Sequence, residues 1–425
     1  MNDIGFNWFD SKTFFRFLGG NIIFQLVTFV SELIILKLID VSAVGAWQLA
    51  LLFQGYVIIS RLGIINSYNR EYVFLSTSSR HNLAKAVLDT TNAHVAMSMV
   101  FQFIFFVGMT LYFLLTGSNK FIVIAFSGMS IYTVLDAASN FAEARSIANN
   151  EFNTISKGKI LASAASILLL VFPYYIGFYG LILRLIGIQL ALFLFLNRSL
   201  PKLSLKHFRR KIWLMLFSDG WKLWIWSYSK GLNKSLPRLF LVNISNISIL
   251  GLFAPVNWIL LSITLFTNSL SLYLYPLLTK QFSKGDKDIS RKALKINFLT
   301  FFLLSPLVIG VCFLVEPFVI WFLPLYSESI FAMRLVAIAS LFEIFSITSS
   351  SWVAAKNWKK MFIDVYGNML IRLVCLSWLF FYDGNILDGI AESILAGSVL
   401  SGLFMIIMVY IEIKENEKKT TILLV

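Results

Sequence analysis

Apolar residues in this chain occur in long blocks separated by short polar segments. Blocks at 22–36, 97–115, 160–176 and 394–411 approach or reach the roughly 20 residues that cross a hydrocarbon core. Backbone groups inside lipid must satisfy their own hydrogen bonds, so such blocks form either helices or barrel strands. Barrel strands alternate in polarity over about ten residues, whereas these blocks are longer and apolar on both alternating faces. The pattern therefore predicts an all-α integral membrane protein.

The blocks predict about twelve membrane-spanning helices. Their expected ranges are 14–38, 45–66, 89–115, 121–144, 157–175, 178–197, 221–242, 250–278, 293–315, 329–353, 361–382 and 387–411. Basic residues fall in the even-numbered loops, and the odd-numbered loops hold only one, Lys120. Because basic loops stay on the cytoplasmic side, both termini are expected in the cytoplasm.

Composition supports the membrane assignment. Hydrophobic residues make up 58% of the chain and charged residues 14%, against about 25% charged residues in a soluble domain. The net charge of +14 follows from the basic loops, so it does not indicate nucleic-acid binding. Cys312 and Cys375 lie in apolar blocks and are expected to be free thiols. The first block has no small-residue cleavage site after it, which favours a retained helix over a cleaved signal.

A basic linker at the middle of the chain divides the helices into two sets of six. The expected domains are an N-terminal lobe at 1–197, a linker at 198–220 and a C-terminal lobe at 221–425. The pairs Ser42/Ser248 and Gly45/Gly251 share an offset of 206 residues, which indicates a repeat and a central cleft between two bundles. The linker pattern suits a helix lying in the membrane interface or a solvated connection, and both alternatives stay open.

Charged residues inside the predicted helices suggest a binding site. Lys222, Lys230, Lys234 and Arg238 are spaced by multiples of four, so they form one slowly rotating stripe on the seventh helix. Intramembrane charges usually face the bundle interior or a water-filled cavity. We therefore predict that Lys230, Lys234 and Arg238 bind an anionic substrate. The alternative is that the outer two members, Lys222 and Arg238, reach towards the membrane interfaces.

Three further arginines are candidates for the same cationic cavity. Arg184, Arg334 and Arg372 lie on the sixth, tenth and eleventh predicted helices. Each is either a substrate ligand or the partner of an acid within the bundle. The repeat offset also matches Arg238 with Glu32, and we hypothesise that this pair approaches across the cleft.

Acidic residues form a second set of candidates. Asp136, Asn140 and Glu143 lie at i, i+4 and i+7, on one face of the fourth helix. The acids Asp136 and Glu143, together with Glu32 and Glu343, are predicted to carry a coupling cation or to neutralise nearby arginines. The second interpretation is slightly favoured.

The usual enzyme motifs are absent from the sequence. Of the three histidines only His94 falls in a predicted membrane segment, and no metal-ligand spacing occurs. There is no phosphate-binding glycine loop of the ATPase type. The sequence therefore indicates neither an enzyme nor a protein that needs a cofactor.

Several segments carry a resemblance to a known family. They are 40–45, between the first two helices; 62–71, closing the second helix; 251–280, with its Tyr275-Pro276 exit; and 317–341, between the ninth and tenth helices. With the helix count and the midpoint linker, the whole chain resembles a bacterial lipid-linked oligosaccharide flippase of the Wzx type. This type belongs to the multidrug/oligosaccharidyl-lipid/polysaccharide exporter superfamily. Where the family often has an acid near residues 233–238, this sequence has Lys234.

The resemblance implies two six-helix lobes that form a V-shaped cavity in the bacterial inner membrane. It implies alternating-access transport of an undecaprenyl-diphosphate-linked repeat unit from the cytoplasmic to the periplasmic leaflet, for O-antigen or another surface polysaccharide. The partners so implied are the lipid-linked glycan, membrane lipid and other polysaccharide-assembly proteins. The alternatives are a cation-coupled multidrug exporter of the same fold and a membrane polysaccharide polymerase. The cationic stripe argues against the exporter, and the lack of a large loop argues against the polymerase.

Overall fold

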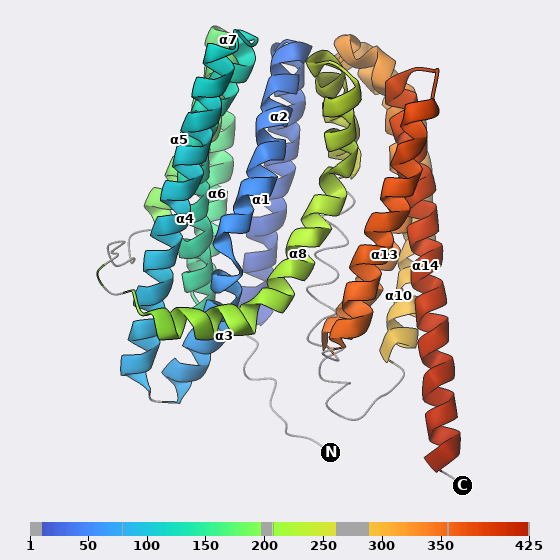
Figure 1. Ribbon diagram of the computed structural model, residues 1–425. Coiled ribbons are helices and arrows are strands. Elements are labelled where there is room, and N and C mark those ends of the chain that lie inside the picture. The colour runs from blue at the N-terminus through green and yellow to red at the C-terminus, as the bar shows by residue number, and fades with distance from the viewer. Residues whose placement is uncertain are drawn as a thin grey trace. The chain divides into compact units, whose positions relative to one another are not determined.

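In the part of the chain that the structure describes, the protein consists of helices joined by short turns (Figure 1). The computed structural model describes residues 11–78, 80–196, 206, 208–260, 289–354 and 357–423. Each of the twelve predicted ranges overlaps a helix there, the eighth through its described part, Ile247–Leu260. The prediction of an all-α membrane protein is therefore confirmed. The orientation deduced from the loop charges stays a prediction.

Contacts between residues divide the chain into two compact units, Met1–Ile225 and Trp226–Val425. We call them the N-terminal unit and the C-terminal unit and describe each by itself. The division falls inside one helix, α8 (Arg210–Ile244). Of the predicted linker at 198–220, residues 198–205 and 207 lie outside the described part of the chain. The predicted lobe boundaries and the central cavity between the lobes stay predictions.

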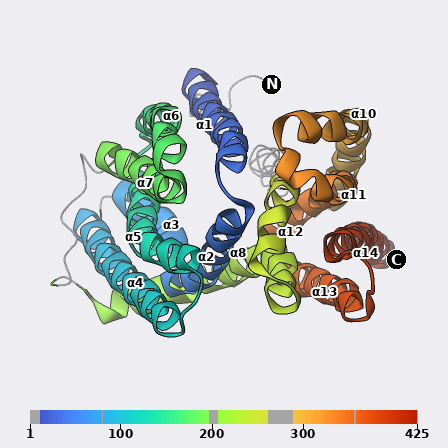
Figure 2. The same ribbon diagram turned by 90° about the horizontal axis from the view of Figure 1, so that it is seen from above.

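In the described part of the N-terminal unit, seven helices precede α8. They are α1 (Ser11–Leu38), α2 (Val41–Val57), α3 (Ile64–Thr77), α4 (His81–Leu115), α5 (Lys120–Ala148), α6 (Phe152–Leu168) and α7 (Val171–Leu196), with a short 3-10 turn, η1 (Ile58–Arg61), after α2. Helix α5 packs against α2, α4 and α7, and α1 packs against α6 (Figure 2). Most of these helices are apolar on all sides, which suits burial among helices and lipid.

The C-terminal unit begins with the second part of α8. It continues with Ile247–Leu260, α10 (Ile289–Phe322), η4 (Pro324–Ser329), α11 (Ile330–Phe342), η5 (Glu343–Thr348), α12 (Ser349–Ala354), α13 (Trp358–Ser377), η6 (Trp378–Phe381) and α14 (Ile386–Leu423). Helix α14 packs against α11 and α13, and α10 packs against α11. The η5 segment interrupts what the sequence analysis predicted as one continuous helix, and Glu343 begins it.

Nine of the described helical segments are long and apolar enough to cross a membrane. They are Gly19–Leu38, Val41–Arg61, His81–Leu115, Lys120–Ala148, Val171–Leu196, Ser290–Phe322, Pro324–Thr348, Trp358–Phe381 and Ile386–Glu415. Helix α6 has 17 residues, just short of this length, and α8 carries the lysines singled out above. These two helices and Ile247–Leu260 account for the difference between the nine segments found among the described residues and the twelve helices predicted from the sequence.

Helix α3 was not predicted as a separate helix. Its first three residues, 64–66, fall at the end of the second predicted span, and the rest of it lies between the second and third predicted spans. Ile64 and Tyr68 on α3 are fully buried and pack against Leu216 of α8. The hydroxyl of Ser67 also donates a hydrogen bond to the carbonyl of Leu216. The end of the predicted linker is therefore helical and packs against α3 rather than forming a purely solvated connection. Its position in the membrane interface stays a prediction.

Close backbone contact at Gly63 gives a first testable prediction. Gly63 has a φ of +71°, and an added Cβ would lie 2.5 Å from the Cβ of Trp224. We expect Gly63→Ala to lower the unfolding free energy by about 1–3 kcal/mol, since it adds both backbone strain and an overlap. Thermal unfolding of the purified protein measures the change. Gly55→Ala is the matched control, because an added Cβ there meets nothing within 4 Å. Equal stability of Gly63→Ala and the wild type would contradict the prediction.

Candidate functional site

A polar pocket in the C-terminal unit contains several of the predicted site residues. It has a volume of about 80 Å³ and lies between α8, the junction of α11 and η5, α13 and α14. At about 10–15 Å³ for each water, this volume holds several small polar groups. The charged side chains that line it are Lys230, Lys234, Glu343, Asp364 and Arg372.

Two of the three cations in the pocket have protein partners. Arg372 forms a salt bridge with Glu343, which also accepts a hydrogen bond of 3.0 Å from the hydroxyl of Ser398. The ammonium group of Lys230 donates to the hydroxyl of Ser349 over 2.8 Å and lies 4.2 Å from the ring centroid of Trp226. The indole face stabilises this cation through the ring quadrupole.

Lys234 differs from its neighbours. Within the described part of the chain, its ammonium group forms no hydrogen bond and no salt bridge. Its electrostatic interactions are with Glu343, which is already bonded to Arg372, with Arg372 itself and with Lys230. A partly buried ammonium group carries three strong donors. Lys234 is therefore the side chain of the pocket best placed to bind an anion.

Four other polar atoms of the pocket wall have no protein hydrogen-bond partner among the described residues. They are Asn233 Oδ1, Asn368 Oδ1, Arg372 Nε and Ser401 Oγ, and all four residues line the pocket. A buried polar group without a partner costs about 1–3 kcal/mol. The wall of the pocket is therefore suited to a polar molecule with both hydrogen-bond acceptors and donors.

The charge of the pocket favours an anion. Three basic and two acidic side chains give 3 − 2, a formal charge of +1. Charges that are partly shielded from water interact more strongly than exposed ones. A phosphate or carboxylate group would thus be attracted, and an organic cation repelled, by the groups that line it. Arg238 is not a lining residue of this pocket, although it lies one turn beyond Lys234 on α8.

Arg184 and Arg334 form ion pairs within their own units. The fully buried Arg184 donates to Glu32 over 3.0 Å and to the carbonyl and hydroxyl oxygens of Ser166 over 3.1 and 2.6 Å. Arg334 pairs with Glu316 over 2.5 Å. This geometry agrees with the alternative that these arginines neutralise acids, and neither residue lines the pocket.

The predicted contact between Glu32 and Arg238 would join residues of different units, since Glu32 belongs to the N-terminal unit and Arg238 to the C-terminal unit. Within the N-terminal unit, Glu32 is already bonded to Arg184. The Glu32–Arg238 approach stays a prediction.

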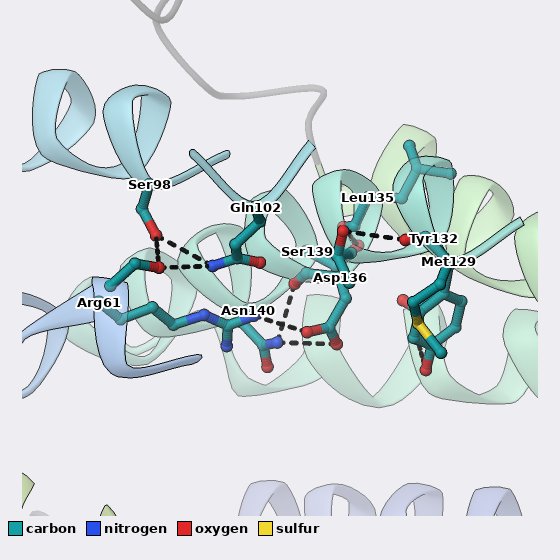
Figure 3. Close-up of polar contacts among 12 residues, drawn as sticks. Arg61, Ser98, Gln102, Met129, Tyr132, Leu135, Asp136, Ser139 and Asn140 are labelled. Carbon is teal, nitrogen blue, oxygen red and sulfur yellow. Dashed lines mark hydrogen bonds and ion pairs between the residues drawn. The ribbon is translucent and has the colours of Figure 1, made fainter. Parts of the chain in front are cut away.

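The predicted acidic face on α5 is bonded to basic residues. Asp136 accepts hydrogen bonds from Arg61 and from Asn140 (Figure 3). The two bonds measure 2.6 and 2.9 Å. Glu143 pairs with Lys159 over 2.6 Å. The favoured interpretation, neutralisation of basic residues, fits these contacts. A coupling role for Asp136 and Glu143 stays a prediction.

Sequence reasoning missed Arg61 and Asp364. Arg61 is a single charge near the end of the second predicted helix, which was itself a signal for an intramembrane partner. Asp364, Asn368 and Arg372 are spaced by four residues on α13, which places them on one face as in the stripe of α8. This four-residue spacing on α13 indicates that the three side chains share one face of the helix, and all three line the pocket.

Comparisons with known proteins identify the fold. The structure is similar to the inward-facing conformation of a multidrug resistance MATE family transporter of the MOP superfamily, with a TM-score of 0.77 and 13% identity over 93% of this chain and 96% of that one. It is also similar to an outward-facing conformation of such a transporter, with a TM-score of 0.65 and 14% identity over 96% of each chain.

A third similar structure is a MOP superfamily transporter from Pyrococcus furiosus whose binding pocket is described as having reverse polarity. Its TM-score is 0.54 at 13% identity, over 95% of this chain and 94% of that one. No protein-family model and no curated protein matches the chain. At these identities the comparisons show a MATE-like fold alone. The predicted fold is thereby confirmed, and membership of the superfamily and of its Wzx type stays a prediction.

Proposed function

We propose that this chain is a membrane transporter that works by alternating access. The observation that carries the proposal is the similarity of the fold to MATE family transporters along nearly the whole chain. Those transporters are known in inward-facing and outward-facing conformations, as alternating access requires. The apolar helices of both units support a multi-pass membrane protein, and the bacterial inner membrane is the proposed location.

The comparisons favour a small-molecule exporter as the first candidate. Two of the three similar structures described above are named as multidrug resistance transporters, and none is named as a flippase. An exporter of this fold would bind a small molecule in one conformation and release it on the other side. This candidate was the alternative in the sequence analysis.

The pocket in the C-terminal unit favours a second candidate, the flippase. Its formal charge of +1 and the ammonium group of Lys234, which has no hydrogen bond or salt bridge among the described residues, suit a diphosphate better than an organic cation. The cargo would be an undecaprenyl-diphosphate-linked oligosaccharide that moves from the cytoplasmic to the periplasmic leaflet. Its polyprenyl tail would stay in lipid while the charged head group crosses. O-antigen or another surface polysaccharide would be the product, and proteins of polysaccharide assembly would be partners.

A reconstitution experiment separates the two candidates. The purified protein is placed in liposomes, and movement is measured for a fluorescent cationic dye and for a fluorescent oligosaccharide linked to undecaprenyl diphosphate. Movement of the lipid-linked cargo at least about tenfold faster than in protein-free liposomes would establish the flippase, because the pocket would lower the cost of its charge. Faster movement of the dye alone would instead establish the small-molecule exporter. Movement of neither cargo would count against both candidates.

A further inference from the structure

The carboxyl group of Asp364 is unlike the other acids of the membrane helices. Among the described residues Asp364 is the only buried Asp or Glu, with 1% of the residue exposed. It accepts a hydrogen bond of 2.7 Å from Asn368 and forms no salt bridge with any described residue. Glu32, Asp136 and Glu343 each bind an arginine. A buried carboxylate with so little compensation is costly to keep ionised.

The charges around Asp364 come from three elements. Helix α8 contributes Lys230 and Lys234, η5 contributes Glu343, and α13 contributes Arg372, while α14 lines the pocket with uncharged residues only. Lys230 acts on Asp364 electrostatically and favours its ionised form, whereas Glu343 favours the protonated form. Because Glu343 is already bonded to Arg372, the two main influences on Asp364 are its burial, which favours the protonated form, and the positive charge of Lys230, which favours the ionised form.

We propose that Asp364 binds and releases a proton, and that its protonation sets the charge of the pocket. With Asp364 ionised the pocket has a formal charge of 3 − 2, or +1, and with Asp364 protonated it has 3 − 1, or +2. Protonation also removes the negative charge of Asp364, which interacts electrostatically with the ammonium group of Lys230. The doubly positive pocket binds an anionic group more tightly than the singly positive one. By linkage, a bound anion therefore favours protonation of Asp364, and protonation of Asp364 favours binding of the anion.

The pocket provides what this proton exchange needs. A carboxylate oxygen of Asp364 takes a proton from a hydronium ion that reaches the pocket, whose O–H bond breaks to leave water, and it returns the proton to a water molecule when the anion leaves. A volume of about 80 Å³ admits several waters beside Asp364. Asn368 donates to the carboxyl group in both states and so keeps it in place. Carboxyl groups within membrane helices commonly serve as proton carriers.

Infrared spectroscopy tests the proton site without any cargo. On acidification of the purified protein we expect a carbonyl band of a protonated carboxyl group that is absent from Asp364→Asn. Asp383→Asn, the same change in an exposed loop of the same unit, should keep this band. In Lys230→Met the band should appear at higher pH, because a positive neighbour that favours the carboxylate is gone. An unchanged band in Asp364→Asn overturns the proposal.

Calorimetry with inorganic diphosphate tests the link to the anion. Repeating the titration in buffers of different ionisation enthalpy gives the protons taken up with each bound diphosphate. We expect uptake in the wild type and in Asp383→Asn, and none in Asp364→Asn. Equal uptake in Asp364→Asn overturns the link.

The link between proton and anion rests on the proposed anionic cargo, whereas the proton site does not. If diphosphate does not bind but the infrared band depends on Asp364, the proton site stands and the anionic cargo is wrong.

Discussion

Replacing Arg184 with leucine is expected to produce the largest loss of stability of any change described for the N-terminal unit. Arg184 is fully buried, and it connects Glu32 of α1 with Ser166 of α6. Its removal leaves the carboxylate of Glu32 without a counter-charge among helices. We expect Arg184→Leu to lower the unfolding free energy by roughly 3–5 kcal/mol. Unfolding of the purified protein in detergent, followed by circular dichroism, measures this effect.

Two further variants test the reason for that loss. The double variant Arg184→Leu with Glu32→Leu removes both charges, so it should recover much of the stability lost by the single change. Arg334→Leu is the matched control, since its pair with Glu316 is partly exposed and contributes only about 0–1 kcal/mol. If the Arg184 and Arg334 variants lose equal stability, the burial of Arg184 is not the cause.

Replacing Lys234 with glutamine is expected to produce the largest loss of transport. Lys234 lines the pocket, and its ammonium group has no hydrogen bond or salt bridge within the described residues. A hydrogen bond to a charged group contributes about 1.5–3 kcal/mol. We therefore expect Lys234→Gln to slow the flipping of a diphosphate-linked cargo by roughly ten- to a hundredfold. The reconstituted flipping assay measures the rate.

The controls for Lys234 separate charge from structure. Lys234→Arg keeps the positive charge and should retain more activity than Lys234→Gln. Lys359→Gln makes the same chemical change at an exposed position on α13 and should leave the rate unchanged. A Lys234→Gln protein that flips the cargo at the wild-type rate would show that this lysine does not bind the substrate.

The helices were predictable because their signal is local. A block such as 97–115 is apolar along its whole length, so its burial in lipid does not depend on which helix it contacts. The amphipathic α3 was missed because it is too polar to span a membrane, and its helical form became clear only through the packing of Ile64 and Tyr68 against α8. The break at Glu343 was also hidden, since η5 remains apolar.

The candidate site was predictable only in part. Four-residue spacing on α8 singled out Lys230 and Lys234, and both line the pocket. The same spacing on α13 connects Asp364 with Arg372, but an isolated acid in a helix does not reveal how deeply it is buried. The role of each arginine was undecided from the sequence, because a single charge has the same pattern whether it binds a substrate or an acid.

The sequence by itself determined the membrane class, the helical blocks and the excess of positive charge, because hydrophobicity and charge are properties of each segment alone. The tertiary structure decided which charges neutralise each other, since Arg184 meets Glu32 across 152 positions of the chain. It also decided that Lys230, Lys234, Asp364 and Arg372 share one pocket. Pairing and burial depend on distances between helices, and these distances arise only when the helices pack.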